Sequence, residues 1–195
     1  YFSQETGEHG KRKYLLAALA DFWTLFAKTP RKERNYYEVI RPACRCKLFL
    51  DVEFMKESNP NVEGHELMQH LLESLIKFLK ISFPFLQDKE VTNFMEMESS
   101  YKHKFSMHYV FTECVFENIS YLGLFMEKFK EFCRKSNKEN LFVRKPQSQE
   151  TTFVCDMGVY NKNRNFRTLY STKRGKNSFL ELKDKKFDKE RFLES

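Results

Sequence analysis

The segment "CKLFLDVEF", Cys46–Phe54, has the aliphatic and aromatic composition of a buried β-strand, yet it carries two acids, Asp51 and Glu53. Successive side chains of a strand point to opposite faces, so both acids fall on the same face. That face comprises Phe49, Asp51, Glu53 and Met55, and the other comprises Leu48, Leu50, Val52 and Phe54. The segment therefore predicts a strand with one apolar face and one face that bears two carboxylates.

The two carboxylates need compensation wherever protein covers their face, because an unpartnered charge is costly to bury. Two steps of about 3.3 Å separate Asp51 and Glu53 by roughly 6.6 Å along the strand, so both can reach one divalent cation or a pair of cations. The alternative is an exposed strand whose outer face simply meets water. The nonapeptide by itself leaves both interpretations open.

Composition restricts the classes of protein to which the chain can belong. A length of 195 residues suits one domain or a compact pair of lobes, and a hydrophobic content of 41%, with 21 Phe, provides a substantial core. Lys and Arg number 34 against 27 Asp and Glu. The resulting net charge of +7 favours polyanionic partners such as nucleic acids or nucleotides.

Cysteine spacing and hydropathy bear on the cellular environment. The five cysteines are odd in number and show no C-x-x-C spacing, so neither a disulfide framework nor a structural zinc site is expected. Reduced thiols indicate an intracellular protein. The most apolar run near the N-terminus is interrupted by Asp21 and is too short to span a bilayer, so no membrane association is expected.

Hydrophobic periodicity predicts an α+β fold. Helical spacing of apolar residues occurs in segments 15–26, 67–79 and 117–134. Strand patterns occur at 36–40, 46–54, 91–99 and 105–112, with two or three short strands between 153 and 183. Residues 55–64 are expected to form a loop, and residues 135–151 mostly a polar linker. The order of these segments predicts a split βαβ-like arrangement. Its helices would cover one face of the sheet and leave the other face available for a site.

The segment "KFSMHYVF", Lys104–Phe111, presents a second polar row, because Lys104, Ser106 and His108 share one face of a strand. A cation, a hydroxyl and an imidazole in a row can donate hydrogen bonds and positive charge to phosphate oxygens. A sheet face in contact with water is the alternative. A Ser–His nucleophile is not favoured, because side chains two residues apart stand parallel and no orienting acid is nearby in the sequence.

A third acid, Asp156, follows an apolar strand and precedes a basic segment that contains no acid. The cations of this segment are Lys162, Arg164, Arg167, Lys173, Arg174 and Lys176. Arginine suits bidentate contact with phosphate, and the interspersed Tyr160, Phe166 and Tyr170 can stack on bases or fill core. Three acids for metal, together with a Lys/Ser/His row and a basic segment for a triphosphate, indicate nucleotidyl transfer.

In three motifs the sequence resembles the archaeo-eukaryotic primase superfamily, and within it the eukaryotic primase-polymerase (PrimPol) family. "CKLFLDVEF" resembles the D-x-E strand of that family, "KFSMHYVF" its S-x-H strand, and "CDMGVYNKNRNFR" the strand with its third acid and N-R-N-F-R run. The motifs occur in the family's order, and weaker similarity extends from about Arg12 to about Lys176.

The resemblance implies a primase-like catalytic core with an RRM-like, mixed or antiparallel sheet and a smaller N-terminal module. Within a single core of residues 1–195, the implied division is a helix and strand module of about 1–45, a catalytic sheet module of about 46–183 and a charged tail of 184–195. The family commonly carries a C-terminal Cys/His zinc-binding region for priming. This chain has no such spacing and is expected to bind no zinc, which favours primer extension over primer synthesis.

The resemblance also implies roles for individual residues. Asp51, Glu53 and Asp156 would be the catalytic acids that bind Mg²⁺ or Mn²⁺ in a two-metal site. The incoming triphosphate would be bound by Lys104, Ser106, His108, Arg164, Arg167 and Lys173. Arg12 would lie against the template strand, and Tyr37 would lie near the incoming sugar, where its ring can resist a 2′-hydroxyl.

The implied activity is template-dependent transfer from dNTP to a 3′-hydroxyl, in repriming or damage-tolerant DNA synthesis in the nucleus or the mitochondrion. The implied partners are a DNA template, a primer and dNTP or NTP, and the protein is expected to act as a monomer. Two other functions stay open. A metal-dependent nuclease needs clustered acids but no triphosphate site. A non-catalytic single-strand binder could use the basic, aromatic sheet face, although its acids would repel phosphate.

Overall fold

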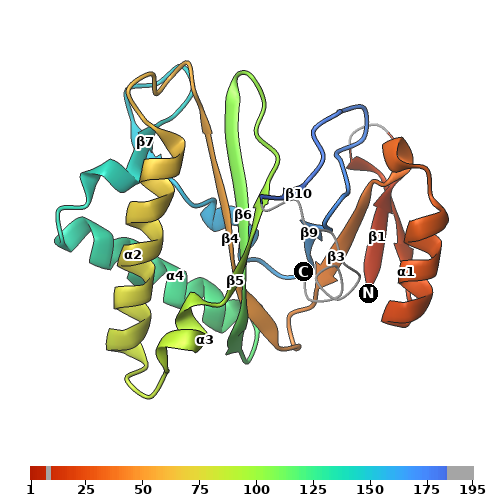
Figure 1. Ribbon diagram of the computed structural model, residues 1–195, viewed down its shortest axis with the longest axis horizontal. Helices are drawn as coiled ribbons and strands as arrows, with labels where there is room; N and C mark the ends of the chain where they lie inside the picture. Colours follow the sequence, from red (N-terminus) through yellow and green to blue (C-terminus); the bar gives the residue numbers. More distant parts are fainter. Residues whose placement is uncertain (8–9, 184–195) are drawn as a thin grey trace.

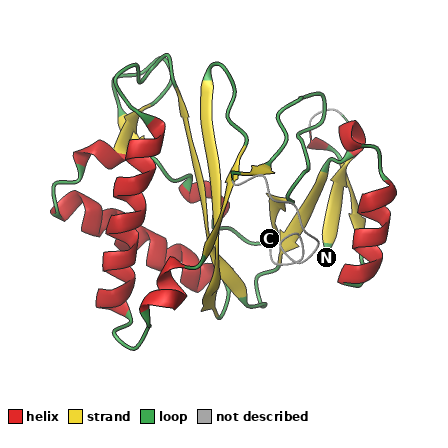
Figure 2. Cartoon of the chain, viewed as in Figure 1, coloured by secondary structure: helices red, strands yellow, loops and turns green. Residues whose placement is uncertain are grey.

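The computed structural model describes residues 1–7 and 10–183 and contains two antiparallel four-stranded sheets with helices (Figure 1, Figure 2). The smaller sheet consists of β2 (Arg12–Leu15), β1 (Phe2–Glu5), β3 (Tyr36–Ile40) and β9 (Arg164–Arg167), in that order. The larger sheet consists of β10 (Glu181–Leu182), β5 (Phe94–Glu98), β6 (Lys104–Phe116) and β4 (Cys46–Met55). The α+β fold class is confirmed, and the predicted charged tail, 184–195, lies outside the described residues.

Helices cover one face of the larger sheet, as expected from the sequence. Figure 1 shows α2 (Gly64–Ser82), α3 (Asp88–Thr92) and α4 (Ile119–Lys135) on the side away from the smaller sheet. The apolar residues of β4 lie in the core with residues of these helices, including Leu48, Leu50, Val52, Leu71, Leu75 and Phe129, all without exposed surface. Each such burial stabilises the fold by about 2 kcal/mol. The opposite face of β4, with its two acids, is therefore turned toward the smaller sheet.

The smaller sheet is covered by α1 (Leu19–Lys28), which buries Phe22 and Phe26. The ring of Phe2 on β1 stacks on Phe22 with 3.6 Å between ring centroids. Strand β9 enters this sheet from much later in the chain and pairs with β3 in antiparallel register. It thereby carries residues of the basic segment to the side of the smaller sheet that meets β4. The predicted division of the core near residue 45 stays a prediction.

The first predicted helix begins later than the periodicity suggested. Residues 15–26 were expected to be helical, but α1 starts at Leu19: Leu15 pairs with β1 as the last residue of strand β2 (Arg12–Leu15), and residues 16–18 connect the strand to the helix. Pairing with a neighbouring strand supplies backbone hydrogen bonds that a short, isolated helical turn lacks. The prediction was wrong for the first turn and correct for the rest of the segment.

The segment expected to be a polar linker, 135–151, contains ordered structure. It includes the 3₁₀ turn η3 (Glu139–Leu141) and strand β7 (Phe142–Arg144), which pairs with β8 (Thr151–Phe153) as a hairpin. The rings of Phe142 and Phe153 lie 5.5 Å apart between centroids. Two further 3₁₀ turns, η2 (Arg31–Glu33) and η4 (Met157–Val159), complete the described elements. The linker prediction was wrong here, because a few apolar residues between polar flanks suffice to anchor a hairpin to the core.

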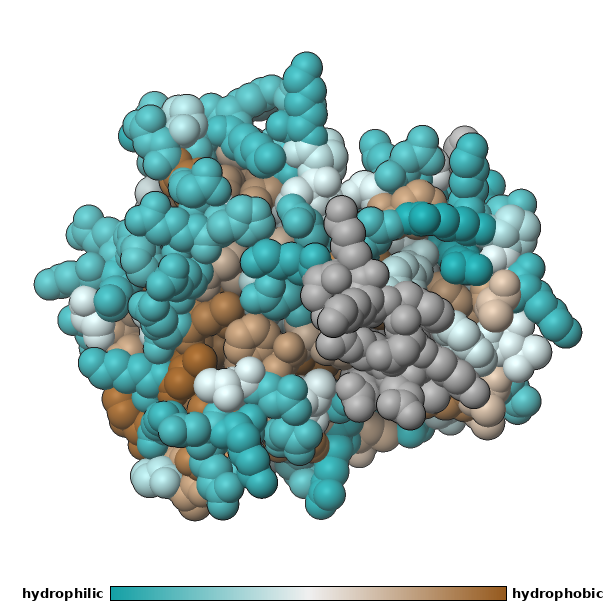
Figure 3. All heavy atoms as spheres, viewed as in Figure 1, coloured by the Kyte–Doolittle hydropathy of each residue, from teal (hydrophilic) through white to brown (hydrophobic). Residues whose placement is uncertain are grey.

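The surface of the molecule agrees with its composition. Hydrophilic residues cover most of the face seen in Figure 3, with apolar atoms visible between the helices of the larger sheet. None of the helices in residues 1–7 and 10–183 combines the length and the apolar character that crossing a membrane requires.

Candidate active site

Strands β4 and β6 place two polar rows side by side. The strands are antiparallel, and their register sets Asp51 opposite His108 and Glu53 opposite Ser106. Lys104, two residues before Ser106 on β6, forms an ion pair with Glu53. The rows that were recognised separately in the sequence are thus one continuous polar surface on the larger sheet.

Asp51 carries a buried oxygen without a partner. Its Oδ1 makes no hydrogen bond among the described residues, and His108 Nε2 lies 3.4 Å from it. Burial, and after it the charge of Glu53, raises the pKa of Asp51 to about 6, although the surrounding cations oppose this shift. A carboxylate oxygen in this condition is suited to a cation, which would supply the missing partner.

The third acid, Asp156, lies beside β4, and one oxygen of its carboxylate caps a turn. Its backbone N–H donates to the carbonyl oxygen of Asp51 at 2.8 Å. Its Oδ1 accepts the N–H of Gly158 at 2.9 Å and thereby caps the turn η4. Within the described ranges, no three His, Cys, Asp or Glu side chains lie together as metal ligands. Asp51 and Glu53 therefore fit a divalent cation as a pair. The other oxygen of Asp156, Oδ2, lies 3.9 Å from Arg164 Nη2. Because a carboxylate has two oxygens, Oδ2 is available to a cation while Oδ1 caps the turn.

A cavity of about 370 Å³ lies between the two sheets and is lined by Asp51 and Glu53 as well as by several cations. Its basic side chains are Arg12, Arg164, Arg167 and Lys173. A buried guanidinium nitrogen in each of the three arginines, and Nδ1 of His108, has no hydrogen-bond partner among the described residues. Burial, and after it the neighbouring cations, holds the pKa of His108 well below its ordinary value, so the imidazole is neutral. Such a set of donors suits an anion with many oxygens.

Arg167 is held in place by hydrogen bonds that cross between the sheets. It lies on β9 with 7% of its surface exposed, donates from Nη1 to the carbonyl oxygen of Ser178 at 3.0 Å and donates from Nη2 to Ser99 Oγ at 2.7 Å. Ser99 Oγ lies 3.1 Å from Ser106 Oγ. Ser99 therefore joins the arginine of the smaller sheet to the polar row of β6. The buried Nε of Arg167 has no hydrogen-bond partner among the described residues.

Tyr37 and Arg12 form a stacked pair at the edge of the cavity. The guanidinium carbon of Arg12 lies 3.9 Å from the centroid of the Tyr37 ring. The Tyr37 hydroxyl donates to Glu5 Oε2 at 2.9 Å, and Glu5 also accepts the backbone N–H of Arg174 at 3.4 Å. Burial, and after it Glu5, raises the pKa of Tyr37 to about 12. The ring is consequently fixed by a carboxylate on β1 and by a cation on β2.

Comparison with known proteins gives relatives of one kind. No family model matches the chain. The DNA-directed primase/polymerase protein of Danio rerio is 29% identical over 94% of this chain and 41% of the relative. Those of Homo sapiens and Mus musculus are 26% and 28% identical over 91% and 89% of this chain. This chain is a homologue of the primase-polymerases. It spans about two fifths of the length of these relatives.

Most residues that the sequence assigned from the primase-polymerase motifs converge in the structure. All except Lys104 and Asp156 line the cavity between the sheets, and these two line a neighbouring cavity that also contains Glu53. Sequence reasoning missed Glu5 and Ser99. Neither stands in a motif, and each contacts its partner only after distant strands have paired, so no local signal could have revealed them.

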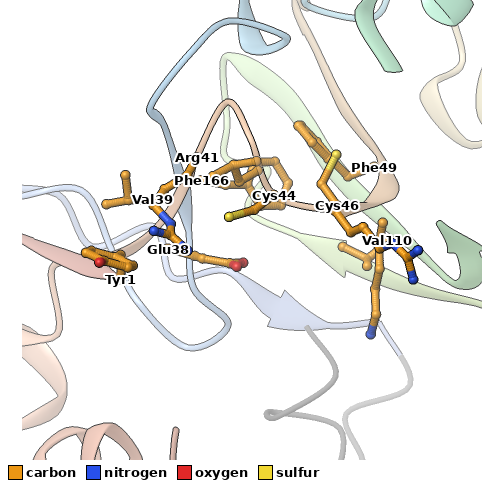
Figure 4. Close-up of a pocket in the computed structure, with 12 residues that line it drawn as sticks. Tyr1, Glu38, Val39, Arg41, Cys44, Cys46, Phe49, Val110 and Phe166 are labelled. Atoms are coloured by element: carbon orange, nitrogen blue, oxygen red, sulfur yellow. The ribbon is translucent and has the colours of Figure 1, made fainter. Parts of the chain in front are cut away.

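A further cavity of about 360 Å³ adjoins the site in this primase-polymerase homologue (Figure 4). Phe166 lines both cavities. The walls of the further cavity combine Arg41 with Glu38 and the thiols of Cys44 and Cys46, which favour no single class of ligand.

Proposed function

We propose that this chain is the catalytic core of a template-dependent DNA polymerase and primase that transfers nucleotides from dNTP to a 3′-hydroxyl. The observation that carries the proposal is a single cavity in which two strand acids lie beside arginines with unpaired buried donors. The names of the relatives support a DNA primase-polymerase at the level of the family. The proposal includes a primase-like fold with an RRM-like sheet, action as a monomer, and repriming or damage-tolerant synthesis in the nucleus or mitochondrion.

The cations and hydrogen-bond donors of the site are proposed to bind the triphosphate. Arg167, Arg164 and Lys173 bind phosphate oxygens, with Lys104 contributing charge beside Glu53. Ser106 and the neutral imidazole of His108 donate hydrogen bonds to the same group. The 3′-oxygen of the primer attacks the α-phosphorus, pyrophosphate leaves, and the proton of the hydroxyl is lost to solvent. Positioning and electrostatic stabilisation, rather than covalent catalysis, account for the rate.

Asp51 and Glu53 are proposed to hold Mg²⁺ or Mn²⁺, with Asp156 as a third ligand. When bound, such ions stabilise the charge that develops on the attacking and leaving oxygens. The unpartnered Oδ1 of Asp51 supports this assignment.

Primer extension tests the proposed function directly. A labelled primer on a DNA template, incubated with dNTP and Mg²⁺ or Mn²⁺, should lengthen with the wild-type protein and not with the Asp51→Ala, Glu53→Ala variant. Shortening of the primer would instead indicate a nuclease. Intact folding and tight DNA binding without extension under either metal would leave a single-strand binder and overturn the proposal.

Tyr37→Ala is expected to weaken exclusion of ribonucleotides. The ring is fixed by Arg12 and Glu5 at the edge of the nucleotide cavity, so its removal makes room for a 2′-hydroxyl. We expect the ratio of kcat/KM for dNTP over that for NTP to fall about tenfold, the usual range for one steric contact.

Two variants serve as controls for Tyr37. Tyr37→Phe keeps the ring and loses only the hydrogen bond to Glu5, so it should retain most of the discrimination. Tyr14→Ala removes an exposed tyrosine of the same sheet and should change nothing. Unchanged discrimination in Tyr37→Ala would refute the assignment.

A further inference from the structure

Nucleotidyl transfer joins two phosphate-bearing molecules, and the attacking and leaving oxygens lie roughly in line. The incoming triphosphate and the strand that supplies the 3′-hydroxyl must therefore approach the acids from different sides. The cavity between the sheets accounts for the triphosphate only. A second site for phosphate is required next to the acids, on another side of them.

Glu53 borders two cavities. The first is the cavity between the sheets, and the second, of about 480 Å³, lies between the end of β4 and the β7–β8 hairpin. Asp156 lines the second cavity and not the first. The row of acids thus separates two spaces, and Asp156 is the one of the three acids that lines only the second.

The second cavity has a basic wall. It is lined by the cations Lys104, Lys130, Arg144 and Lys145 and by only two acids, Glu53 and Asp156. Lys130 and Lys145 have ion pairs with exposed acids of their own segments, which a phosphate can displace at little cost. The side chain of Arg144 forms no ion pair with any of the described residues. Its guanidinium is therefore available to an anion.

The backbone of Arg144 is fixed by hydrogen bonds to the side chain of Asn59. Asn59, which is buried, donates from Nδ2 to the carbonyl oxygens of Met55 and Arg144 at 3.0 and 3.2 Å. The backbone N–H of Arg144 donates to Asn59 Oδ1 at 2.8 Å. One side chain thereby ties the hairpin to the end of β4, two residues beyond Glu53. Such anchoring reduces the entropy lost when Arg144 binds a ligand.

We propose that this second cavity binds the phosphate backbone of the primer strand near its 3′ end, with Lys130 and Arg144 as the contacts. The inference rests on the proposed function, because it assigns the second substrate of that reaction. Apolar residues in the same walls, including Val143, Pro146 and Met157, offer a surface for the sugars between the phosphates.

The test compares the double variant Lys130→Ala, Arg144→Ala with the matched control Lys128→Ala, Lys138→Ala. The control removes the same charge from exposed positions on and after α4 that do not line the cavity. We expect the double variant to raise KM for the primed template about tenfold and to leave KM for dNTP unchanged. The slope of log affinity against log salt should fall by about two, one for each lost phosphate contact.

Binding measured by fluorescence anisotropy gives a readout that needs no catalysis. The double variant should lose affinity for a primed template and keep its affinity for the unprimed strand of the same sequence. Equal loss for both DNAs, or a loss no greater than in the control, would overturn the inference while leaving the polymerase proposal intact. A wild-type protein that extends no primer would overturn the proposed function, and the binding comparison would still decide whether the cavity recognises the primer strand.

Discussion

Asp51→Asn is expected to abolish primer extension and, at neutral pH, to make the protein more stable. Asp51 is a buried carboxylate whose pKa is raised from its ordinary value of 3.8 to about 6 and whose Oδ1 has no partner among the described residues. The folded protein therefore opposes its ionisation. Removing the charge should raise the free energy of unfolding by about 1 to 3 kcal/mol at pH 8.

The sign of the pH dependence follows from linkage. A raised carboxyl pKa means that the folded state holds the proton more tightly than the unfolded chain does. The destabilisation by Asp51 is absent below pH 3.8, grows as the pH rises toward 6, and is complete above 6. Thermal melts with a chelator present should show that Asp51→Asn is more stable than wild type at pH 8. Near pH 4 this difference in stability should disappear. A variant that is less stable than wild type at both pH values would contradict the prediction.

Glu53→Gln is the matched comparison on the same strand. Burial acts to raise the pKa of Glu53, but the hydrogen bond and charge of Lys104 outweigh it, so the pKa lies below its ordinary value. The ionised form is thus favoured in the folded state. Glu53→Gln should also lose extension activity but should not gain stability. Substitution of the two acids would then have the same effect on activity, and only the substitution of Asp51 would raise stability.

Arg167→Lys is expected to lower kcat/KM for dNTP by about 100- to 1,000-fold, which corresponds to roughly 3 to 4 kcal/mol of transition-state stabilisation. The guanidinium is held by Ser99 and Ser178, Arg167 lines the cavity between the sheets, and its Nε has no partner among the described residues. An ammonium cannot bind both serine residues and a phosphate in the same planar arrangement. Steady-state kinetics with varied dNTP measures the effect.

Ser99→Ala tests the hydrogen bond that positions Arg167 separately from the positive charge of Arg167. It removes the 2.7 Å hydrogen bond to Arg167 but keeps the guanidinium, so it should cost about tenfold or less in kcat/KM and about 1 kcal/mol in stability. If Arg167→Lys retained normal kcat/KM, the arginine would be only a structural tie between the sheets.

The sequence alone determined the faces of the strands and the class of the fold. Alternation in 46–54 placed both acids on one face of their strand, and alternation in 104–111 placed the Lys/Ser/His row on one face of the other strand, because successive side chains of a strand point to opposite faces. The two main helices of the larger sheet followed from apolar spacing for the same reason. These features are local, so a single segment contains all the information that they require.

Tertiary structure alone decided which of these faces meet. The register of β4 and β6 set Asp51 opposite His108, and the return of β9 to the smaller sheet placed Arg167 beside Ser99. Pairing with β1 made Leu15, where the helical spacing begins, the last residue of strand β2, and the β7–β8 hairpin formed where a linker was expected. Glu5 gained its contact with Tyr37, and Arg144 its contacts with Asn59, in the same way. Such contacts join residues far apart in the chain, and they depend on packing energies summed over the whole core rather than on any one segment.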